Sequence, residues 1–509
     1  MIDDQQTISR GRRISMLAEL HPDKPALIFV ALDRAERIVT WQDLDKSSNQ
    51  IARLFQQYGV KEDSTVLIGL SNSPEHYLVA IAAWKLGAMV IPFRWDMPKV
   101  EREELLALVQ PNLVVADWSV DPYLTLSSVD LSQANALSDK PHPDITPNPG
   151  LATTSGGSTG RPKLIVQHDP LESVPGALTK EPDLGYFLGF RTKQIQLVAG
   201  PLYHGAPFGW GHSGLIEDHT LIVTEKWDTV LIAELIERHR INFMFMVPTM
   251  MIRLAKLDHI DDYDFSSVTA LFHAGGKCPA WVKRFWIERL GSQNIYEAFG
   301  STEAVGHTTI PGDEWLEHPG SVGRPKYCDV KILDSGMNEV TTGEVGEIYF
   351  RLHLPLKPTY RYIGSPPAKA TPDGFESMGD MGWVDESGYL YISDRRVDMI
   401  ISGGANIFPA EVEAVLNQHH AVKDVVVIGL PNEEWGRTVH AIIVIDTYNK
   451  TSLVNELNIF CRQHLMSYKV PKSYEFLPSL PRDTMGKIRR KALMQERESD
   501  WSSDFIYIS

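Results

Sequence analysis

Cysteine is scarce in this chain, and two other common features are missing altogether. The 509 residues include three cysteines, Cys278, Cys328 and Cys461, which are far apart and lack metal-ligand spacing. Their surroundings predict buried thiols in a reducing compartment. No apolar run reaches membrane-spanning length, and the first residues lack the apolar stretch of a signal peptide. We therefore expect a soluble, cytoplasmic protein without a membrane span.

An excess of basic residues is also missing. The chain has 49 lysine and arginine residues against 65 aspartate and glutamate residues, a formal net charge of −16 at pH 7. A general nucleic-acid-binding protein would present a basic face, so we expect no nucleic-acid partner. A few local cations still suffice to bind the phosphates of a nucleotide.

The remaining composition is that of an ordinary globular protein, with 43% hydrophobic and 22% charged residues. The length predicts roughly two to four domains. Helical and strand patterns alternate along the first part of the chain, as in the strand 65–70, helix 74–86 and strand 89–92. This alternation predicts an α/β fold with a large N-terminal region of parallel sheets covered by helices.

Two changes of pattern divide the rest of the chain. From about residue 320, short strands separated by glycine turns predict antiparallel structure and a small β-barrel. Beyond residues 395–398, mixed helices and strands predict a separate α+β unit. We therefore expect an N-terminal domain over residues 1–396, with its β-rich part at about 320–396, and a C-terminal domain over residues 397–509. The residues at 500–509 carry no functional signal.

The most informative stretch is the polar run at residues 153–163, which combines glycines, hydroxyl groups and the cations Arg161 and Lys163. Apolar residues precede and follow it, which predicts a loop between two strands. Glycine allows close backbone approach to a ligand, and the hydroxyls and cations suit phosphate oxygens. A Walker A loop is excluded because Pro162 separates the cations and no helix pattern follows. The alternative, a flexible glycine- and serine-rich surface loop, fits poorly between two apolar strands.

Other polar clusters also follow predicted strands. His204 follows the strand 194–199, the glycine turn 274–276 follows the strand 270–273, and Glu303 closes a polar turn after residue 295. Ligands of open α/β sheets bind beyond the carboxyl ends of the strands. We therefore expect these clusters and the loop at 153–163 to line one crevice.

Together these signatures resemble the adenylate-forming superfamily of acyl-CoA synthetases, luciferases and peptide-synthetase adenylation domains. The resemblance covers roughly residues 10–492, with the motifs in the family's order. The segments 156–163 (Gly-Gly-Ser-Thr-Gly-Arg-Pro-Lys) and 299–303 (Phe-Gly-Ser-Thr-Glu) are most similar to the bile-acid-CoA ligase branch and to the amide-forming coronafacate ligases. The resemblance implies a mobile C-terminal domain that carries a catalytic lysine.

The resemblance also implies an ATP site with bound Mg²⁺. Glu303 would hold the metal, Thr302 the α-phosphate, and Phe299 the adenine ring, at a position where relatives usually have tyrosine. The remaining ATP contacts would be Thr154, Ser155, Ser158, Thr159 and Lys163 in the phosphate loop, and Asp380 and Arg395 at the ribose. At the hinge, Val397 stands where many relatives have aspartate or lysine. Taken alone, Glu303 could be a helix-capping carboxylate and Asp380 a turn residue.

A third group of residues is implied for the acid and the acceptor. His204 and Lys487 would act on the reacting carboxylate and phosphate, and Gly403 and Gly404 would leave a channel for the acceptor. The expected acyl pocket consists of Phe208, Trp210, Phe272, Gly275, Ala298 and Val305. Its aromatic content suggests a bulky or cyclic acid, although such residues are equally typical of ordinary core.

The predicted reaction is activation of a small-molecule carboxylic acid by Mg-ATP to acyl-AMP and pyrophosphate, followed by transfer to CoA. One alternative keeps the first step and transfers the acyl group to an amine, as an amide bond synthetase does. The other is a non-catalytic nucleotide-binding regulator, because a fold alone does not imply chemistry. A sensor would not need Lys487, which argues against the regulator. The sequence does not distinguish CoA from an amine.

Overall fold

The computed structural model describes residues 7–119, 121–156, 162–168, 170–353, 359–395, 398–402, 405–432, 435–445, 450–483, 488–499 and 505–507. Five of the predicted site residues lie outside these ranges: Ser158, Thr159, Gly403, Gly404 and Lys487. Of Ser155 and Arg395, only the backbone is described. Within the described ranges, no helix is both long enough and apolar enough to cross a membrane.

The N-terminal part is a parallel sheet covered by helices, as the alternating pattern predicts. Its strands pair in the order β5-β4-β6-β7, all parallel. The strands are β4 (Thr65–Gly69), β5 (Met89–Pro92), β6 (Leu113–Ala116) and β7 (Thr125–Leu126), and the helices are α1 (Arg10–Leu20), α2 (Trp41–Gln57), α3 (Pro74–Lys85) and α4 (Lys99–Val109). Helix α2 begins with a capping box, in which the Thr40 hydroxyl accepts from the Asp43 N–H at 3.1 Å.

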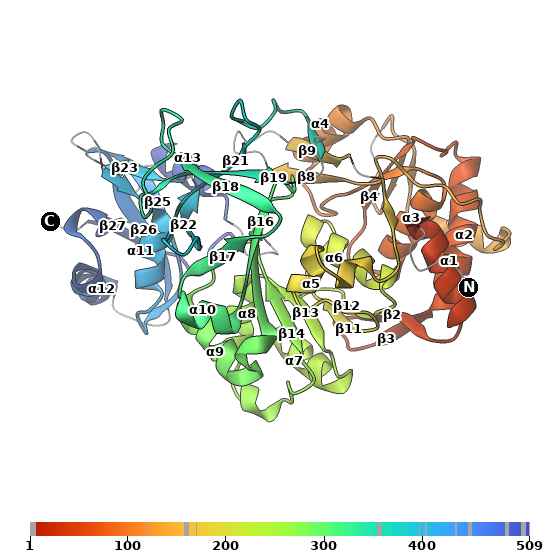
Figure 1. Ribbon diagram of the computed structural model, residues 1–509, viewed down its shortest axis with the longest axis horizontal. Helices are drawn as coiled ribbons and strands as arrows, with labels where there is room; N and C mark the ends of the chain where they lie inside the picture. The colour runs from red at the N-terminus through yellow and green to blue at the C-terminus, as the bar shows by residue number, and fades with distance from the viewer. Residues whose placement is uncertain are drawn as a thin grey trace.

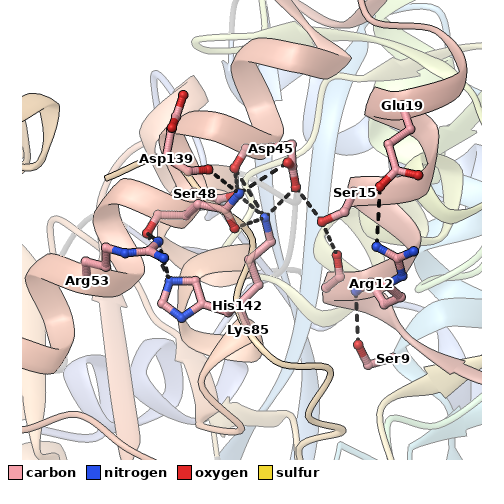
Figure 2. A network of polar contacts seen from close by, with 12 residues as sticks. Ser9, Arg12, Ser15, Glu19, Asp45, Ser48, Arg53, Lys85, Asp139 and His142 are labelled. Atoms are coloured by element: carbon pink, nitrogen blue, oxygen red, sulfur yellow. Dashed lines mark hydrogen bonds and ion pairs between the residues drawn. The ribbon is translucent and has the colours of Figure 1, made fainter. Parts of the chain in front are cut away.

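A buried lysine ties the first three helices together (Figure 2). Lys85 of α3 donates to Asp45 Oδ1 at 2.7 Å and to Ser48 Oγ at 2.9 Å, both on α2. Ser15 of α1 donates to the same Asp45 oxygen at 2.6 Å. Burial lowers the pKa of Lys85 to about 8, although Asp45 opposes this shift. These contacts satisfy the charges and hold the helices as one body behind the sheet.

The largest sheet has thirteen strands in the order β18-β19-β21-β22-β17-β16-β15-β14-β13-β11-β12-β2-β3. Its central strands are parallel to one another: β2 (Pro25–Val30), β12 (Thr220–Thr224), β11 (Ile195–Val198), β13 (Phe243–Met246), β14 (Ala270–His273) and β15 (Ile295–Gly300). β13 and β14 are buried throughout, which explains their continuous apolar sequence. The parallel order places the carboxyl ends of β11, β13, β14 and β15 along one edge.

Helices cover this sheet, and β3 (Glu36–Thr40) closes one end of it antiparallel to β2. The helices are α5 (Leu184–Phe187), α6 (Gly205–Ile216), α7 (Thr229–Arg238), α8 (Pro248–Ala255), α9 (Ala280–Leu290) and α10 (Gly312–Glu317). Short 3-10 helices occur at Asp130–Ala136, Ala177–Thr179, Ile260–Asp262, Ser292–Asn294 and Ser467–Lys469. A two-stranded pair joins β1 (Ile8–Ser9) to β10 (Glu172–Ser173).

The antiparallel strands expected after residue 320 are present at the other end of the large sheet. They are β16 (His307–Pro311), β17 (Ser321–Pro325), β18 (Cys328–Leu333), β19 (Gly346–Leu352), β21 (Glu376–Val384) and β22 (Leu390–Arg395). Among the described residues their hydrogen-bonding order is open, from β18 to β17, and β16 connects them to β15. The region expected to form a small barrel is therefore an antiparallel continuation of the large sheet.

The phosphate-loop candidate connects two strands, as predicted. β8 (Ala152–Gly156) and β9 (Pro162–Gln167) are antiparallel, and β20 (Tyr360–Ile363) pairs with the other side of β9. This three-stranded sheet brings residues near 360 beside residues near 163. The loop residues 157–161 themselves lie outside the described ranges.

The C-terminal part has its own sheet and core. Its elements are β23 (Ile400–Ser402), β24 (Ala405–Ile407), α11 (Pro409–Leu416), β25 (Val422–Asn432), β26 (Gly436–Ile445), α12 (Lys450–His464), β27 (Ser473–Phe476), α13 (Arg490–Ser499) and β28 (Ile506–Tyr507). The main sheet pairs in the order β25-β26-β27-β28, so the chain's last strand covers the edge of β27. Figure 1 shows this part, in blue, at the opposite end of the molecule from α1, α2 and α3. The domain boundary near residue 397 stays a prediction.

Candidate active site

The predicted crevice residues meet at the carboxyl edge of the large sheet. His204 follows β11 and immediately precedes α6, whose first residue is Gly205. A Cβ atom at Gly205 would lie 3.6 Å from Cγ2 of Thr153 and 3.9 Å from Cγ2 of Thr302. The start of the phosphate-loop hairpin, the His204 turn and the turn after β15 are therefore direct neighbours.

Lys163 and Glu303 form the charged centre of this edge. Lys163 Nζ lies 3.5 Å from Glu303 Oε1, and both side chains are largely buried, with exposures of 20% and 16%. Tyr362 donates to the same Glu303 oxygen at 2.6 Å, and Lys163 Nζ lies 4.1 Å from the centre of its ring. The sequence-based interpretation did not include Tyr362, because nothing near it in the chain resembles a phosphate or metal motif.

The surroundings of Glu303 keep its carboxylate ionised. Burial alone would raise the pKa of Glu303, but the hydrogen bond from Tyr362 and the charge of Lys163 hold it below its ordinary value. Burial, together with the bond to Glu303, raises the pKa of Tyr362, which stays a protonated donor. An ionised carboxylate is the hard oxygen ligand that Mg²⁺ requires. The exposed Thr302 beside it leaves room for a phosphate oxygen.

The predicted adenine contact lies on β15, and the predicted ribose contacts lie on β21 and β22, farther along the same sheet. Phe299 is half-buried on β15, with its ring 6.3 Å from that of Phe350. Asp380 is buried on β21, and its Cα is paired with that of Arg395 on β22. The register of these two consecutive strands thus places the backbones of the two candidate ribose residues opposite each other.

The predicted acyl-pocket residues do not all come together. Trp210, Phe272 and Ala298 share one apolar cluster, and the rings of Trp210 and Phe272 are 5.3 Å apart. Val305 is buried in the neighbouring cluster that includes Phe299. Gly275 has φ +84°, and a Cβ there would lie 3.6 Å from Val247 Cγ1.

Phe208 instead packs away from this group. It is fully buried against His212, with ring centroids 4.1 Å apart, and 5.9 Å from the ring of Trp84 on α3. Side chains two positions apart on a helix point to nearly opposite sides of its axis, so Phe208 and Trp210 lie on opposite sides of α6. Phe208 belongs to the core beneath α6, and the structure does not bring it to Trp210 and Phe272.

Asn72 is a positioning residue that sequence reasoning missed. Its buried amide donates to the carbonyls of Gly200 and Thr224, both at 3.0 Å, and accepts from the Leu202 N–H at 2.8 Å. The side chain therefore fixes the turn that leads from β11 to His204. Its position directly after β4 and before α3 is the signal that could have indicated it.

A group of potential metal ligands occurs in the C-terminal part. His419, His420 and Glu456 bring ligand atoms within 4.8 Å of one another. His419 Nδ1 accepts from the Ala421 N–H at 3.3 Å, which places the ring proton on Nε2, 3.2 Å from Glu456 Oε1. A protonated Nε2 cannot bind a metal, so hydrogen bonding accounts for this group.

These features define a nucleotide-binding α/β enzyme with its site at the carboxyl edge of a sheet. The sequence matches the AMP-binding enzyme family over residues 16–355 and the AMP-binding enzyme C-terminal domain over residues 411–487. The chain belongs to the AMP-binding enzyme family. This confirms the expected adenylate-forming superfamily and the class of ATP-dependent, AMP-forming acid ligases. The particular branch stays a prediction.

Similar proteins align over nearly the whole chain. The 2-succinylbenzoate–CoA ligase of Bacillus pumilus is 30% identical, covering 94% of this chain and 96% of its own. The fatty acid–[acyl-carrier-protein] ligase ScoC of Streptomyces coeruleorubidus is 28% identical, covering 94% of both chains.

Solved structures support the fold. The o-succinylbenzoate CoA synthetase of Bacillus subtilis with its acyl-adenylate has a TM-score of 0.78 at 24% identity, covering 96% of this chain and 98% of that one. The anthranilate CoA ligase AuaEII with anthranoyl-AMP has a TM-score of 0.80 at 21% identity, covering 96% and 97%. The predicted fold class, a large α/β region followed by a smaller domain, is confirmed.

Proposed function

We propose that this protein activates a bulky or cyclic carboxylic acid with Mg-ATP and transfers the acyl group to CoA. In the first step a carboxylate oxygen bonds to the α-phosphorus, and the bond from that phosphorus to pyrophosphate breaks. In the second step the CoA sulfur bonds to the acyl carbon, AMP leaves, and the thiol proton passes to solvent. The observation that carries this proposal is the meeting of Lys163 and Glu303 at 3.5 Å beside Thr302.

Each candidate residue has a defined task in the first step. Lys163, with the hydroxyls of the phosphate loop, would hold the β- and γ-phosphates. Glu303 would bind Mg²⁺, which supplies positive charge to the departing pyrophosphate. Thr302 would donate to the α-phosphate and Lys487 would neutralise the charge that develops there. The adenosine contacts would be Phe299, Asp380 and Arg395.

The acid would lie between α6 and the ends of β14 and β15. His204 would lie at one end of this acyl pocket. The other proposed lining residues are Trp210, Phe272, Ala298, Gly275 and Val305. The aromatic rings favour a flat or cyclic acid. Several relatives are 2-succinylbenzoate–CoA ligases, and this aromatic acid fits the same expectation.

For the second step we favour CoA over an amine. The 2-succinylbenzoate ligases that align with this chain are named as CoA ligases. The acceptor would reach the acyl-adenylate past Gly403 and Gly404 after the C-terminal domain rotates. One ion pair between the two parts, Arg489 with Glu101 of α4 at 3.2 Å, is 69% exposed at the arginine and so would oppose rotation little.

A screen for acid-dependent pyrophosphate release tests the first step. Benzoate-type, other cyclic and fatty acids are compared, with Glu303→Gln as the loss variant and Glu288→Gln, at an exposed site, as the matched control. We expect release with a cyclic acid, a loss on the order of 10²-fold in Glu303→Gln, and no loss in the control. No release with any acid would contradict the adenylation proposal.

The acceptor is tested by mass spectrometry on the same reactions. The acid that is turned over is incubated with ATP and either CoA or an amino acid. We expect a thioester with CoA at sub-millimolar concentration, in the usual range of KM. Amide formation with the amine, and no thioester with CoA, would establish the alternative of an amide bond synthetase.

A further inference from the structure

Strand β20 reaches Glu303 at two points. Thr359, just before β20, donates its hydroxyl to the Glu303 backbone carbonyl at 3.0 Å. Tyr362, within β20, donates to Glu303 Oε1 at 2.6 Å. One short strand therefore fixes both the backbone and the carboxylate of the residue that would bind the metal.

The same strand also reaches the phosphate-loop cation. β20 pairs antiparallel with β9, and Tyr362 is opposite Ile165. Lys163 is two residues before Ile165, so it lies diagonally across from Tyr362 on the same face, within reach of a long side chain. Lys163 Nζ accordingly lies 4.1 Å from the centre of the Tyr362 ring. The pairing register of β9 and β20 therefore brings Lys163 and Tyr362 into contact.

Tyr362 uses different parts of its side chain for these two partners. The hydroxyl donates to the anion, and the electron-rich face of the ring attracts the cation. Without the Tyr362 side chain, the direct contact between the flexible side chains of Lys163 and Glu303 would be their ion pair at 3.5 Å. A partly buried aromatic ring loses little conformational freedom by serving as the common support.

We propose that Tyr362 is a positioning residue of the adenylation site, which holds Glu303 ready for Mg²⁺ and Lys163 ready for the terminal phosphates of ATP. The inference rests on the proposed function and adds to it a residue outside the recognised motifs. When Mg-ATP binds, Lys163 moves from Glu303 to phosphate oxygens, while the Tyr362 hydroxyl keeps the carboxylate oriented. Binding then requires less reorganisation of the site.

The chain offers a matched control on the same strand. Tyr360 is two residues before Tyr362, on the same face, with the two rings 5.0 Å apart. Its hydroxyl donates to Glu376 at 2.7 Å, not to Glu303. Tyr360→Phe thus removes a buried hydroxyl that lies beside that of Tyr362, and it keeps the direct contacts of Tyr362 with Glu303 and Lys163.

The experiment measures nucleotide binding by titration calorimetry on the full chain, with no acid present. Tyr362→Phe keeps the ring and loses the hydroxyl. We expect its affinity for Mg-ATP to fall on the order of 10-fold, the usual effect of losing a hydrogen bond to a charged group. Its affinity for ATP in EDTA should stay within about 2-fold of wild type, since Lys163 keeps its ring contact. Tyr362→Leu should also weaken ATP binding in EDTA, by about 5-fold.

Thermal unfolding of each variant checks that the site is folded, and Tyr360→Phe should bind Mg-ATP like wild type. Equal affinities of wild type and Tyr362→Phe for Mg-ATP would overturn the inference. An equal loss in Tyr362→Phe and Tyr360→Phe, or an equal loss with and without Mg²⁺, would also overturn it, because a merely structural role predicts these results. Failure of the wild type to bind Mg-ATP would instead contradict the proposed function, so the two failures are distinguishable.

Discussion

Gly205 at the start of α6 lies against Thr302 at the end of β15, such that a Cβ atom on the glycine would be 3.9 Å from Thr302 Cγ2. Gly209 follows one helical turn later on the same face, and a Cβ atom there would meet no other atom within 4 Å. The side of α6 that carries Gly205 and Gly209 is therefore open at Gly209 and adjacent to the candidate α-phosphate contact at Gly205. This is where the acid would lie.

We expect Gly209→Phe to narrow the acyl pocket. The added Cβ atom would enter open space, and the backbone of Gly209 is not in the left-handed region, so the protein should fold. Pyrophosphate release with a cyclic acid should fall on the order of 10-fold or more, as expected when a pocket loses room for substrate. Release with a short aliphatic acid, where the enzyme accepts one, should change much less. Equal losses with both acids would show that Gly209 does not line the pocket.

Lys487→Ala should affect only the first half-reaction. The lysine is expected to neutralise charge in the adenylation transition state, so acid-dependent pyrophosphate release should fall on the order of 10²-fold. Thioester formation from a supplied acyl-adenylate and CoA should continue at nearly the wild-type rate. Single-turnover measurements of the two steps check this. Normal pyrophosphate release in the variant would remove Lys487 from the mechanism.

Asn72→Ala should destabilise the turn before His204. The substitution leaves two buried carbonyls and one N–H without their partner, which predicts a decrease in the free energy of unfolding of about 3 kcal/mol. Urea denaturation measures this decrease. The control is Asn135→Ala, at an exposed site, whose free energy of unfolding should stay within about 0.5 kcal/mol of the wild-type value. If Asn72→Ala unfolds with the wild-type free energy, the turn is stable without the Asn72 side chain.

The buried His76 should make stability fall with acidification. Burial lowers its pKa to about 3, so between about pH 6.5 and pH 3 the unfolded chain binds a proton that the folded protein does not. The free energy of unfolding therefore decreases as the pH falls through this window. From pH 7 to pH 5 the contribution of this one group is at most about 2 kcal/mol.

His76→Phe removes that contribution and keeps a ring beside Phe208. Its free energy of unfolding should decrease less than that of wild type between pH 7 and pH 5, measured by urea denaturation at each pH. Asn135→Ala, which removes an exposed side chain that does not titrate, should keep the wild-type slope. An unchanged slope in His76→Phe would show that its ring is protonated in the folded protein.

Local pattern was sufficient to predict several elements of this protein. The strand 65–70, helix 74–86 and strand 89–92 expected from the alternating pattern correspond to β4, α3 and β5. Apolar residues on both sides of the run 153–163 predicted two strands, which correspond to β8 and β9. The hairpin around the phosphate-loop candidate and the order of the motifs predicted the adenylate-forming superfamily. Each of these signals depends on residues close together in the chain.

The tertiary structure decided what local pattern could not. Helix α6 contains glycines at 205, 209, 211 and 214, which lower its intrinsic helix propensity, so its packing between α1 and the large sheet stabilises it. The same helix turns Phe208 away from Trp210. Tyr362 reached Glu303 and Lys163 only because β20 pairs with β9 across a long stretch of chain. The periodicity of the sequence indicates which side of a helix or strand is buried. What packs against that side depends on strand register and helix packing. Those are determined by segments that are distant in the sequence.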